Sequence, residues 1–470
     1  MHDATGGGAR AILARAAALA ADHIERRRET PVVGNLDEKA LTARLQAYDF
    51  QSSRPAEDVM TDLFDLLGRS AVRSDHPRYF GLFNPPALAP AIAGDIATAT
   101  ANPQLAVWSH APAAAEIERK LVSYFGSLVW ADGPIAGTFT SGGSEANHSA
   151  LLSALAARYP DWSRQGVPTG GRRPTIYASA ESHLAWIKIA RISGLGSDAV
   201  RLVPAPDGLS LTGDALAAAI AGDTDRDPVL VVATAGTTAH GAIDDLAGIA
   251  AVGRAHRAHV HVDAAWAGGA LLDPDRRPLF GGIEQADSVT IDPHKWIAVP
   301  MGAGLYLARD WGPLSAAFSV ATGYMPSAST ERHDAYIHSM QWSRRFIGGK
   351  LFMALATLGL DGYRAMIGRQ FALADRLRSR LADDGWAIAN DTALPLVCFF
   401  PADGEDESVR AIEAAVVASG RAWLSSVRLR GQLVLRACIT GFETDADDVE
   451  ALVSFLAEAR RATHPHGSSK

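Results

Sequence analysis

The sequence has little cysteine and no long hydrophobic run. Its two cysteines, Cys398 and Cys438, each lie within an apolar stretch, which favours reduced core thiols over a disulfide framework or a zinc site. The apolar runs end well before the roughly 18 residues that a membrane helix needs, and a basic start followed by a cleavage region is missing. We therefore expect a cytoplasmic protein without a membrane segment.

Lysine is scarce as well. Only six of the 44 basic residues are lysine, so a lysine in an apolar setting stands out. The 44 basic and 52 acidic residues give a net charge of −8 without a basic stripe, which argues against nucleic acid and anionic membranes as partners. At roughly 150 residues per domain, the chain length predicts about three units.

The chain divides into three regions by pattern. Residues 1–95 have helical periodicity and predict an N-terminal helical arm, and residues 96–315 alternate short apolar runs with helix-length segments. That alternation predicts an α/β domain whose mostly parallel central sheet has helices on both faces. Residues 316–470 predict a mobile loop, a long helix around Gly348–Ile367 and a small α+β C-terminal domain with strands Leu396–Phe400 and Leu433–Cys438. The strands expected in the large domain are Ile135–Phe139, Thr175–Ala178, Val229–Thr234, Val260–Asp263, Ser288–Ile291 and Gly304–Ala308.

Polar residues follow most of these apolar runs. In open parallel sheets, ligands bind at the carboxyl ends of the strands, so the residues there are the candidates for chemistry. The segments concerned are Ser141–Ser144, Ser179–His183, Gly236–Thr238, Asp263 and Asp292–Lys295.

The first of these segments, Gly142-Gly143-Ser144, opens an expected helix. Two glycines let backbone N–H groups approach an anion at the positive end of the helix dipole, which would make a phosphate cradle. A plain glycine turn with a serine cap explains the same residues about as well. The nucleophile elbow of an α/β-hydrolase is a third interpretation, and these residues alone leave it open.

Asp263 and Lys295 each end or follow a strand. Because two alanines follow Asp263, a flat ring could lie close to its carboxylate, which could bind a protonated ring nitrogen. The alternative is a helix N-cap. Lys295, between His294 and Trp296, could supply a partly desolvated amine that forms an imine, unless it is an ordinary surface lysine.

The histidines allow both ligand and structural roles. His183 could stack on an aromatic ligand or cap a helix. His256, His259 and His261 suggest a metal site, but strand alternation puts only His259 and His261 on one face and leaves His256 in the preceding helix. We therefore predict no metal.

Together these motifs resemble the group II pyridoxal-phosphate-dependent amino-acid decarboxylases, with aromatic-L-amino-acid decarboxylases as the model. Their order and spacing match throughout, which is specific enough to reject the hydrolase elbow. The likeness extends to His76–Gly81, Gly323-Tyr324 and Arg344–Phe346. The motifs that carry it are Thr140–Asn147, Ser182-His183, Thr234–Thr238, His261–Trp266 and Asp292–Trp296.

The resemblance implies the fold-type I pyridoxal-phosphate-dependent transferase fold, with residues 96–315 as the cofactor-binding domain, and an obligate homodimer with active sites near the subunit interface. It implies that Lys295 is the Schiff-base lysine, Asp263 the partner of the pyridinium nitrogen and His183 the residue stacked on the ring. Ala265 would pack on the opposite ring face. The remaining cofactor-binding residues implied are Gly142, Gly143, Ser144, Thr237 and His294.

The resemblance also implies the reaction, in which an L-amino acid loses carbon dioxide and becomes an amine. Tyr324, on the family's mobile loop, would deliver a proton to Cα. In the family, phenylalanine at that position accompanies aldehyde formation, as does loss of the stacking histidine in some members. Since Tyr324 and His183 are both present, we expect the amine.

The substrate is less well defined. Phe80, Leu82, Phe83 and Trp108 would line the pocket and favour an aromatic amino acid. Asn84-Pro85-Pro86, where animal aromatic decarboxylases carry a Pro-Thr pair, and the replacements Gln104 and Ala106 would make that pocket roomier or more polar.

Arg436 could pair with a substrate carboxylate, or it could be structural. The alternatives are a decarboxylase of an acidic or diamino acid (glutamate, aspartate or 2,4-diaminobutyrate), and an aldehyde synthase, a carbon–carbon lyase or a transaminase on the same cofactor. A non-catalytic binding protein is improbable with Lys295, Asp263 and His183 all intact.

Overall fold

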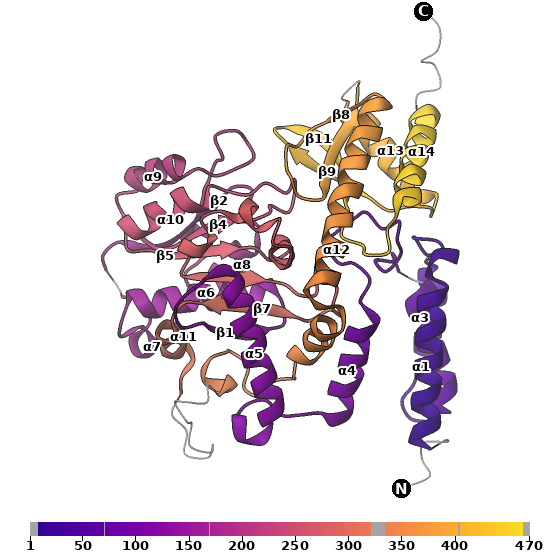
Figure 1. The fold of residues 1–470 in the computed structure, drawn as a ribbon, viewed down its shortest axis with the longest axis horizontal. Coiled ribbons are helices and arrows are strands. Elements are labelled where there is room, and N and C mark those ends of the chain that lie inside the picture. Colours follow the sequence, from indigo (N-terminus) through magenta and orange to yellow (C-terminus); the bar gives the residue numbers. More distant parts are fainter. Residues whose placement is uncertain (1–7, 70, 169, 321–333, 403–404, 464–470) are drawn as a thin grey trace, which may run out of the picture.

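The large domain is built on a seven-stranded sheet (Figure 1). The computed structural model describes residues 8–69, 71–168, 170–320, 334–402 and 405–463. The strand order is β1-β7-β6-β5-β4-β2-β3, and β7 runs antiparallel to both of its neighbours. The predicted mostly parallel sheet is thus confirmed. The strands are β1 (Ala136–Thr140), β2 (Arg173–Ser179), β3 (Val200–Val203), β4 (Arg226–Thr234), β5 (His259–Asp263), β6 (Ser288–Ile291) and β7 (Gly304–Ala308).

Helices cover both faces of this sheet. The core on one face joins the sheet to α5, α9 and α10, whereas α6 and α8 pack on the other face, where α11 joins α6. Because both faces are covered, the strands are almost continuously apolar, as in β4, where all but the first residue are buried. The helices of this domain are α4 (Ala89–Ala101), α5 (Pro112–Val129), α6 (Gly143–Arg158), α7 (Trp162–Gln165), α8 (Ala185–Ile192), α9 (Gly213–Gly222), α10 (Leu246–Ala255) and α11 (Trp311–Phe318).

A long helix, α12 (Gly348–Asp383), leads from the large domain to the small one (Figure 1). It is interrupted at Gly359, whose φ of 64° is outside the helical region, a conformation that glycine adopts without a Cβ penalty. The predicted helix, Gly348–Ile367, therefore covers the first part of a longer element.

The small domain consists of a four-stranded antiparallel sheet packed on helices, in the order β10-β11-β9-β8. This confirms the predicted α+β C-terminal unit. Phe80, from the distant N-terminal region, is fully buried in the core of this domain, and its N–H donates to the Trp423 carbonyl. The elements are β8 (Trp386–Ile388), β9 (Leu396–Pro401), α13 (Asp406–Ala418), β10 (Ser425–Leu429), β11 (Gln432–Cys438) and α14 (Ala446–Thr463).

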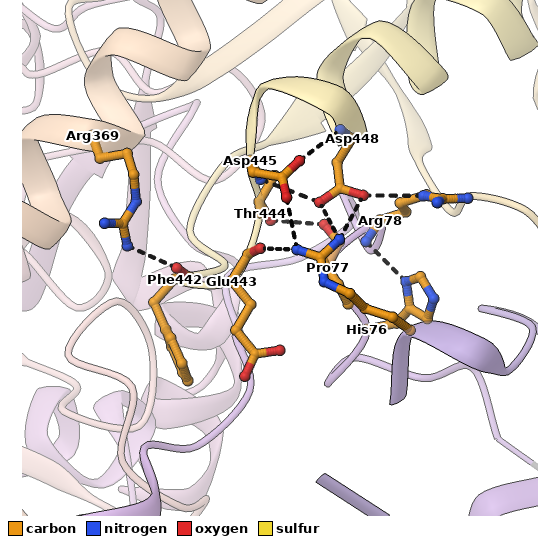
Figure 2. A network of polar contacts seen from close by, with 10 residues as sticks. His76, Pro77, Arg78, Arg369, Phe442, Glu443, Thr444, Asp445 and Asp448 are labelled. Carbon is orange, nitrogen blue, oxygen red and sulfur yellow. Dashed lines mark hydrogen bonds and ion pairs between the residues drawn. The ribbon is translucent and has the colours of Figure 1, made fainter. Parts of the chain in front are cut away.

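The N-terminal helices α1 (Ala9–Glu25), α2 (Glu38–Gln46) and α3 (Ala56–Arg69) form an arm beside the body (Figure 1). None of their residues is buried. Ion pairs connect the N-terminal region to the start of α14. The buried Asp448 pairs with Arg28 through Oδ2 and with Arg78 through Oδ1, each at 3.1 Å (Figure 2 shows the Arg78 contact). Among the described helices, none combines the length and apolarity needed to cross a membrane.

His76 lies at this junction (Figure 2). Its Nδ1 accepts the Arg78 N–H at 2.9 Å, and burial, then the charges of Arg78 and Arg73, lowers its pKa from 6.5 to about 4. A histidine whose pKa is lower in the folded than in the unfolded state contributes stability above pH 6.5. The fold loses that contribution as the pH falls from 6.5 to 4.

Between pH 7 and pH 4, the free energy of unfolding of the wild type should therefore fall by about 2 kcal/mol more than that of His76→Asn. Asparagine keeps an acceptor for the Arg78 N–H without titrating. Urea denaturation at both pH values measures the difference. Equal pH dependence of the two proteins would contradict the role given to His76.

Candidate functional site

A cavity of about 320 Å³ lies at the carboxyl edge of the large sheet. Segments that follow β1, β2, β4, β5 and β6 meet there, as the strand-end pattern predicted. The structure brings together Lys295, Asp263, His183 and most of the residues expected around them. The lining residues are Ser141, Gly142, Gly143, Ser144, Glu145, Asn147, His183, Thr234, Gly236, Thr238, Asp263, Ala265, Trp266, Asp292, His294 and Lys295.

One end of the cavity is suited to an anion. Helix α6 begins at Gly143, so its first backbone N–H groups lack intrahelical partners. A Cβ on Gly143 would lie 2.8 Å from Asp292 Oδ2, and one on Gly142 would lie 3.0 Å from His294 Cε1. Only glycine lets those two side chains close over the backbone here.

His294 adds a donor to this end. Its Nδ1 accepts the Ala303 N–H at 3.1 Å, and burial is the main cause that lowers its pKa from 6.5. The neutral ring therefore carries its hydrogen on Nε2, which makes this nitrogen a donor. Together with the N-terminus of α6, it makes this end of the cavity suited to a phosphate group.

Lys295 and Asp292 form an ion pair in the cavity, with Nζ 3.0 Å from Oδ2. Asp292 is 2% exposed, and its Oδ1 is buried without a hydrogen-bond partner among the described residues. An unpaired buried carboxylate oxygen is costly, so the pocket is suited to a ligand that brings a hydrogen-bond donor to Asp292.

Asp263 lies at the end of β5, where Oδ1 accepts the Ala265 N–H at 3.1 Å and Oδ2 accepts Asn147 Nδ2–H at 2.7 Å. These two donors fix the orientation of the carboxylate. His183 lines the cavity, and its Nδ1 accepts the Ala185 N–H at 3.2 Å at the start of α8.

An anion cradle, a carboxylate held by its own donors, an amine and an imidazole thus line one cavity. These four groups fit a phosphorylated pyridine aldehyde, whose phosphate, ring nitrogen, carbonyl carbon and ring face each need a separate partner. The fold and the site therefore define a pyridoxal-phosphate-dependent enzyme. Among the described residues, no group of three or more histidine, cysteine or acidic side chains is arranged to hold a metal ion.

The chain belongs to the pyridoxal-dependent decarboxylase family, whose conserved-domain model matches residues 40–401. It is 30% identical to an L-2,4-diaminobutyrate decarboxylase of Rhizobium meliloti, over 83% of this chain and 79% of the relative. It is 27% identical to tryptophan decarboxylase 1 of Oryza sativa subsp. japonica, over 92% and 89%.

Solved structures agree with this assignment. The structure of Oryza sativa TDC with PLP and tryptamine matches with a TM-score of 0.90 and 25% identity, over 97% of this chain and 98% of that one. Mouse CSAD matches with a TM-score of 0.89 and 25% identity, over 96% and 99%. The protein is therefore a pyridoxal-phosphate-dependent carboxy-lyase that acts on an amino acid.

Other residues predicted for the site lie beside the cavity. Thr237 is fully buried, and its hydroxyl bonds His240 at 3.0 Å, while the adjacent Thr238 lines the cavity. Phe83 stacks on the lining residue Trp266 with 4.3 Å between ring centroids.

Phe80, Trp108 and Arg436 are not among the lining residues. Phe80 is in the core of the small domain, and Trp108 Nε1 donates to Glu116 at 3.0 Å. Arg436 donates to the Thr238 carbonyl at 2.6 Å, to Ser425 Oγ at 3.2 Å and to the Gly81 carbonyl at 3.4 Å. Tyr324 lies outside the described residues.

Sequence reasoning gave no role to Asn147 or Asp292, although both belong to the motifs. Asn147 follows Gly143 by four residues, so it lies one helical turn further along α6. Asp292 precedes Lys295 by three residues, at the end of β6. Helical spacing alone would have placed Asn147 above the cradle, but its contact with Asp263 depends on the packing of α6 over β5.

Proposed function

We propose that this enzyme converts an aromatic L-amino acid to the corresponding amine and carbon dioxide. The cavity carries cations and anions that are already engaged: Lys295 binds Asp292, and Glu145 accepts Ser141 N–H and Oγ–H at 2.7 Å and Gln341 Nε2–H at 2.8 Å. Beside Phe83, Arg436 donates to the carbonyl oxygens of Thr238 and Gly81. Among the described lining residues, each carboxylate and the lysine already has a protein partner, so a charged substrate side chain would have to displace one of these contacts.

Each residue of the cavity has a separate role in the proposed reaction. The bound cofactor supplies an aldehyde carbon and an electron-poor ring that accepts the electron pair left by the departing carboxylate. The N-terminus of α6 and His294 would bind the phosphate, Asp263 would hold a proton on the ring nitrogen, and His183 would contact the ring. Lys295 would hold the aldehyde carbon, and Asp292, 3.0 Å from its Nζ, would accept the proton that the ammonium gives up.

The expected test is carbon dioxide release from a panel of amino acids. Tryptophan, tyrosine, phenylalanine and 3,4-dihydroxyphenylalanine should give a kcat/KM at least tenfold above those of glutamate, aspartate, cysteine sulfinate and 2,4-diaminobutyrate, because a charged side chain would be desolvated and would have to displace an existing contact to gain a partner. If any charged amino acid had a higher kcat/KM than the aromatic amino acids, the aromatic assignment would be wrong, whereas the assignment to the decarboxylase family would stand.

A second candidate is a diamino acid decarboxylase. It is supported by the 30% identity to an L-2,4-diaminobutyrate decarboxylase and by Glu145, a carboxylate on the cavity wall. A substrate ammonium would have to displace Gln341 from Glu145. Gln341→Ala should then increase kcat/KM for 2,4-diaminobutyrate and leave it unchanged for tryptophan.

Tyr324 decides between amine and aldehyde. As the proposed proton donor to Cα, it ends the reaction at the amine, so Tyr324→Phe should lose amine formation and release aldehyde and ammonia with oxygen consumption. Chromatography of the products and an oxygen electrode measure both. An unchanged amine yield would exclude Tyr324 as the donor.

We further propose a cytoplasmic homodimer with its active sites near the subunit interface. The arm leaves several large apolar residues exposed, and α5 and α12 border a second apolar hollow, which a partner subunit would cover. Sedimentation should give twice the chain mass of 49.6 kDa, and a monomer at micromolar concentration would contradict the dimer. The exposed arm residues are Leu13, Leu36, Leu45, Phe50, Val59, Leu63 and Leu67.

A further inference from the structure

A chain of buried polar side chains runs from Asp263 away from the cavity. Asp263 Oδ2 lies 2.7 Å from Asn147 Nδ2, and Asn147 Oδ1 lies 3.1 Å from His261 Nε2. On the other side of the imidazole, His261 Nδ1 lies 2.8 Å from Ser288 Oγ, which in turn lies 2.7 Å from His259 Nε2. Three elements, α6, β5 and β6, contribute to it.

The inner members of this chain are inaccessible to water. Asn147 is 2% exposed, and His261 and Ser288 are fully buried. Strand register places Ser288 opposite His261, and the edge of the Trp186 ring covers His261 with 5.7 Å between ring centroids. Such a network can persist only if each donor meets an acceptor.

The carboxylate of Asp263 fixes the direction of every donor. A carboxylate only accepts, so Asn147 must present its amide nitrogen to Asp263 and its oxygen to His261. His261 must then carry its hydrogen on Nε2, which it shares with Thr290 Oγ1 at 3.3 Å. Burial, and then the charge of His259, keeps the pKa of His261 well below 6.5, so the ring is neutral and Nδ1 accepts.

The outer half follows by the same reasoning. Since His261 Nδ1 accepts, the Ser288 hydroxyl donates to it, and Ser288 Oγ accepts from His259 Nε2–H. Each hydrogen bond in the chain therefore points toward Asp263. Because the Ala265 N–H occupies Oδ1, the carboxylate is held at both oxygens, in one orientation.

From this geometry we infer that Asn147, His261 and Ser288 are positioning residues for Asp263. They hold its carboxylate in one rotamer, so that its remaining lone pairs would face the ring nitrogen of the bound cofactor. They act through Asp263 and do not contact the substrate. A carboxylate that has lost its main donor binds the ring nitrogen more weakly and in more than one orientation.

Asn147→Ala tests the inference most directly, because it removes the donor and leaves the carboxylate. We expect the apoprotein to bind pyridoxal phosphate about tenfold more weakly, and kcat to fall about tenfold with KM within about twofold of wild type. Cofactor affinity is measured by titrating the apoprotein and following the visible absorbance. The matched control is Ser149→Ala, which removes a buried hydroxyl on the same helix that donates to the Glu145 carbonyl at 3.0 Å. It should change neither quantity.

Wild-type cofactor affinity and kcat in a folded Asn147→Ala protein would overturn the inference, as would a rise in KM alone. If that variant does not fold, Ser288→Ala decides. It removes the third hydrogen bond of the chain, counted from Asp263, and we expect cofactor affinity and kcat each to fall about threefold. A folded Ser288→Ala protein with wild-type affinity and kcat would likewise overturn it. Since the cofactor is established by family and site, either failure leaves the proposed substrate untouched.

Discussion

Replacing Lys295 by alanine is expected to lower the rate of carbon dioxide release by at least about a thousandfold. The variant loses the amine that holds the aldehyde carbon and also leaves Asp292 as a buried carboxylate without its 3.0 Å partner. The visible absorbance of the lysine-bound cofactor should vanish. Some cofactor should still bind, because the contacts to its phosphate are unchanged. Trapping of released carbon dioxide and absorption spectroscopy measure the two effects.

Lys188→Ala is the matched control. Lys188 is one of the six lysines and lies exposed on α8, five residues after His183. It should keep both the activity and the absorbance. A Lys295→Ala protein that keeps wild-type turnover and the visible band would remove Lys295 from the reaction.

Asp263→Ala should lower kcat by at least about a hundredfold, which is the usual cost of removing a group that stabilises charge in the transition state. Without the carboxylate, the ring nitrogen is no longer held protonated and accepts the departing electron pair less readily. Asn147 also loses its acceptor, so cofactor affinity should fall together with kcat. Steady-state kinetics at saturating pyridoxal phosphate measures the loss in kcat alone.

The control for this change is Asp214→Asn, an exposed carboxylate on α9, which should leave kcat unchanged. If Asp263→Ala kept more than about a tenth of wild-type kcat, the ring nitrogen would not depend on this carboxylate.

Sequence reasoning succeeds where the pattern is local. The strand that ends at Ile291 is buried throughout, and the strand that ends at Asp263 is buried at all but its first residue, so their apolar runs mark them clearly. The alternation that put His259 and His261 on one face is confirmed, since both bond Ser288. Strand β3 escaped prediction because it lies at the sheet edge, where only Val203 is buried, and a half-exposed strand of four residues carries little apolar signal.

Contacts between segments far apart in the sequence could not be predicted from it. Phe80 has the aromatic side chain expected of a residue that lines a substrate pocket, but it is buried in the core of the small domain. Arg436 suited a carboxylate partner, yet its guanidinium binds carbonyls of Thr238 and Gly81. In both cases the outcome depends on how the two domains meet, which no spacing along the chain records.

The covalent attachment of the cofactor tests the account most directly. The holoenzyme is reduced with borohydride, digested and analysed by mass spectrometry, and six lysines make the assignment unambiguous. The account predicts a phosphopyridoxyl group on the peptide that contains Lys295. The same group on any other lysine, or on none, would contradict it.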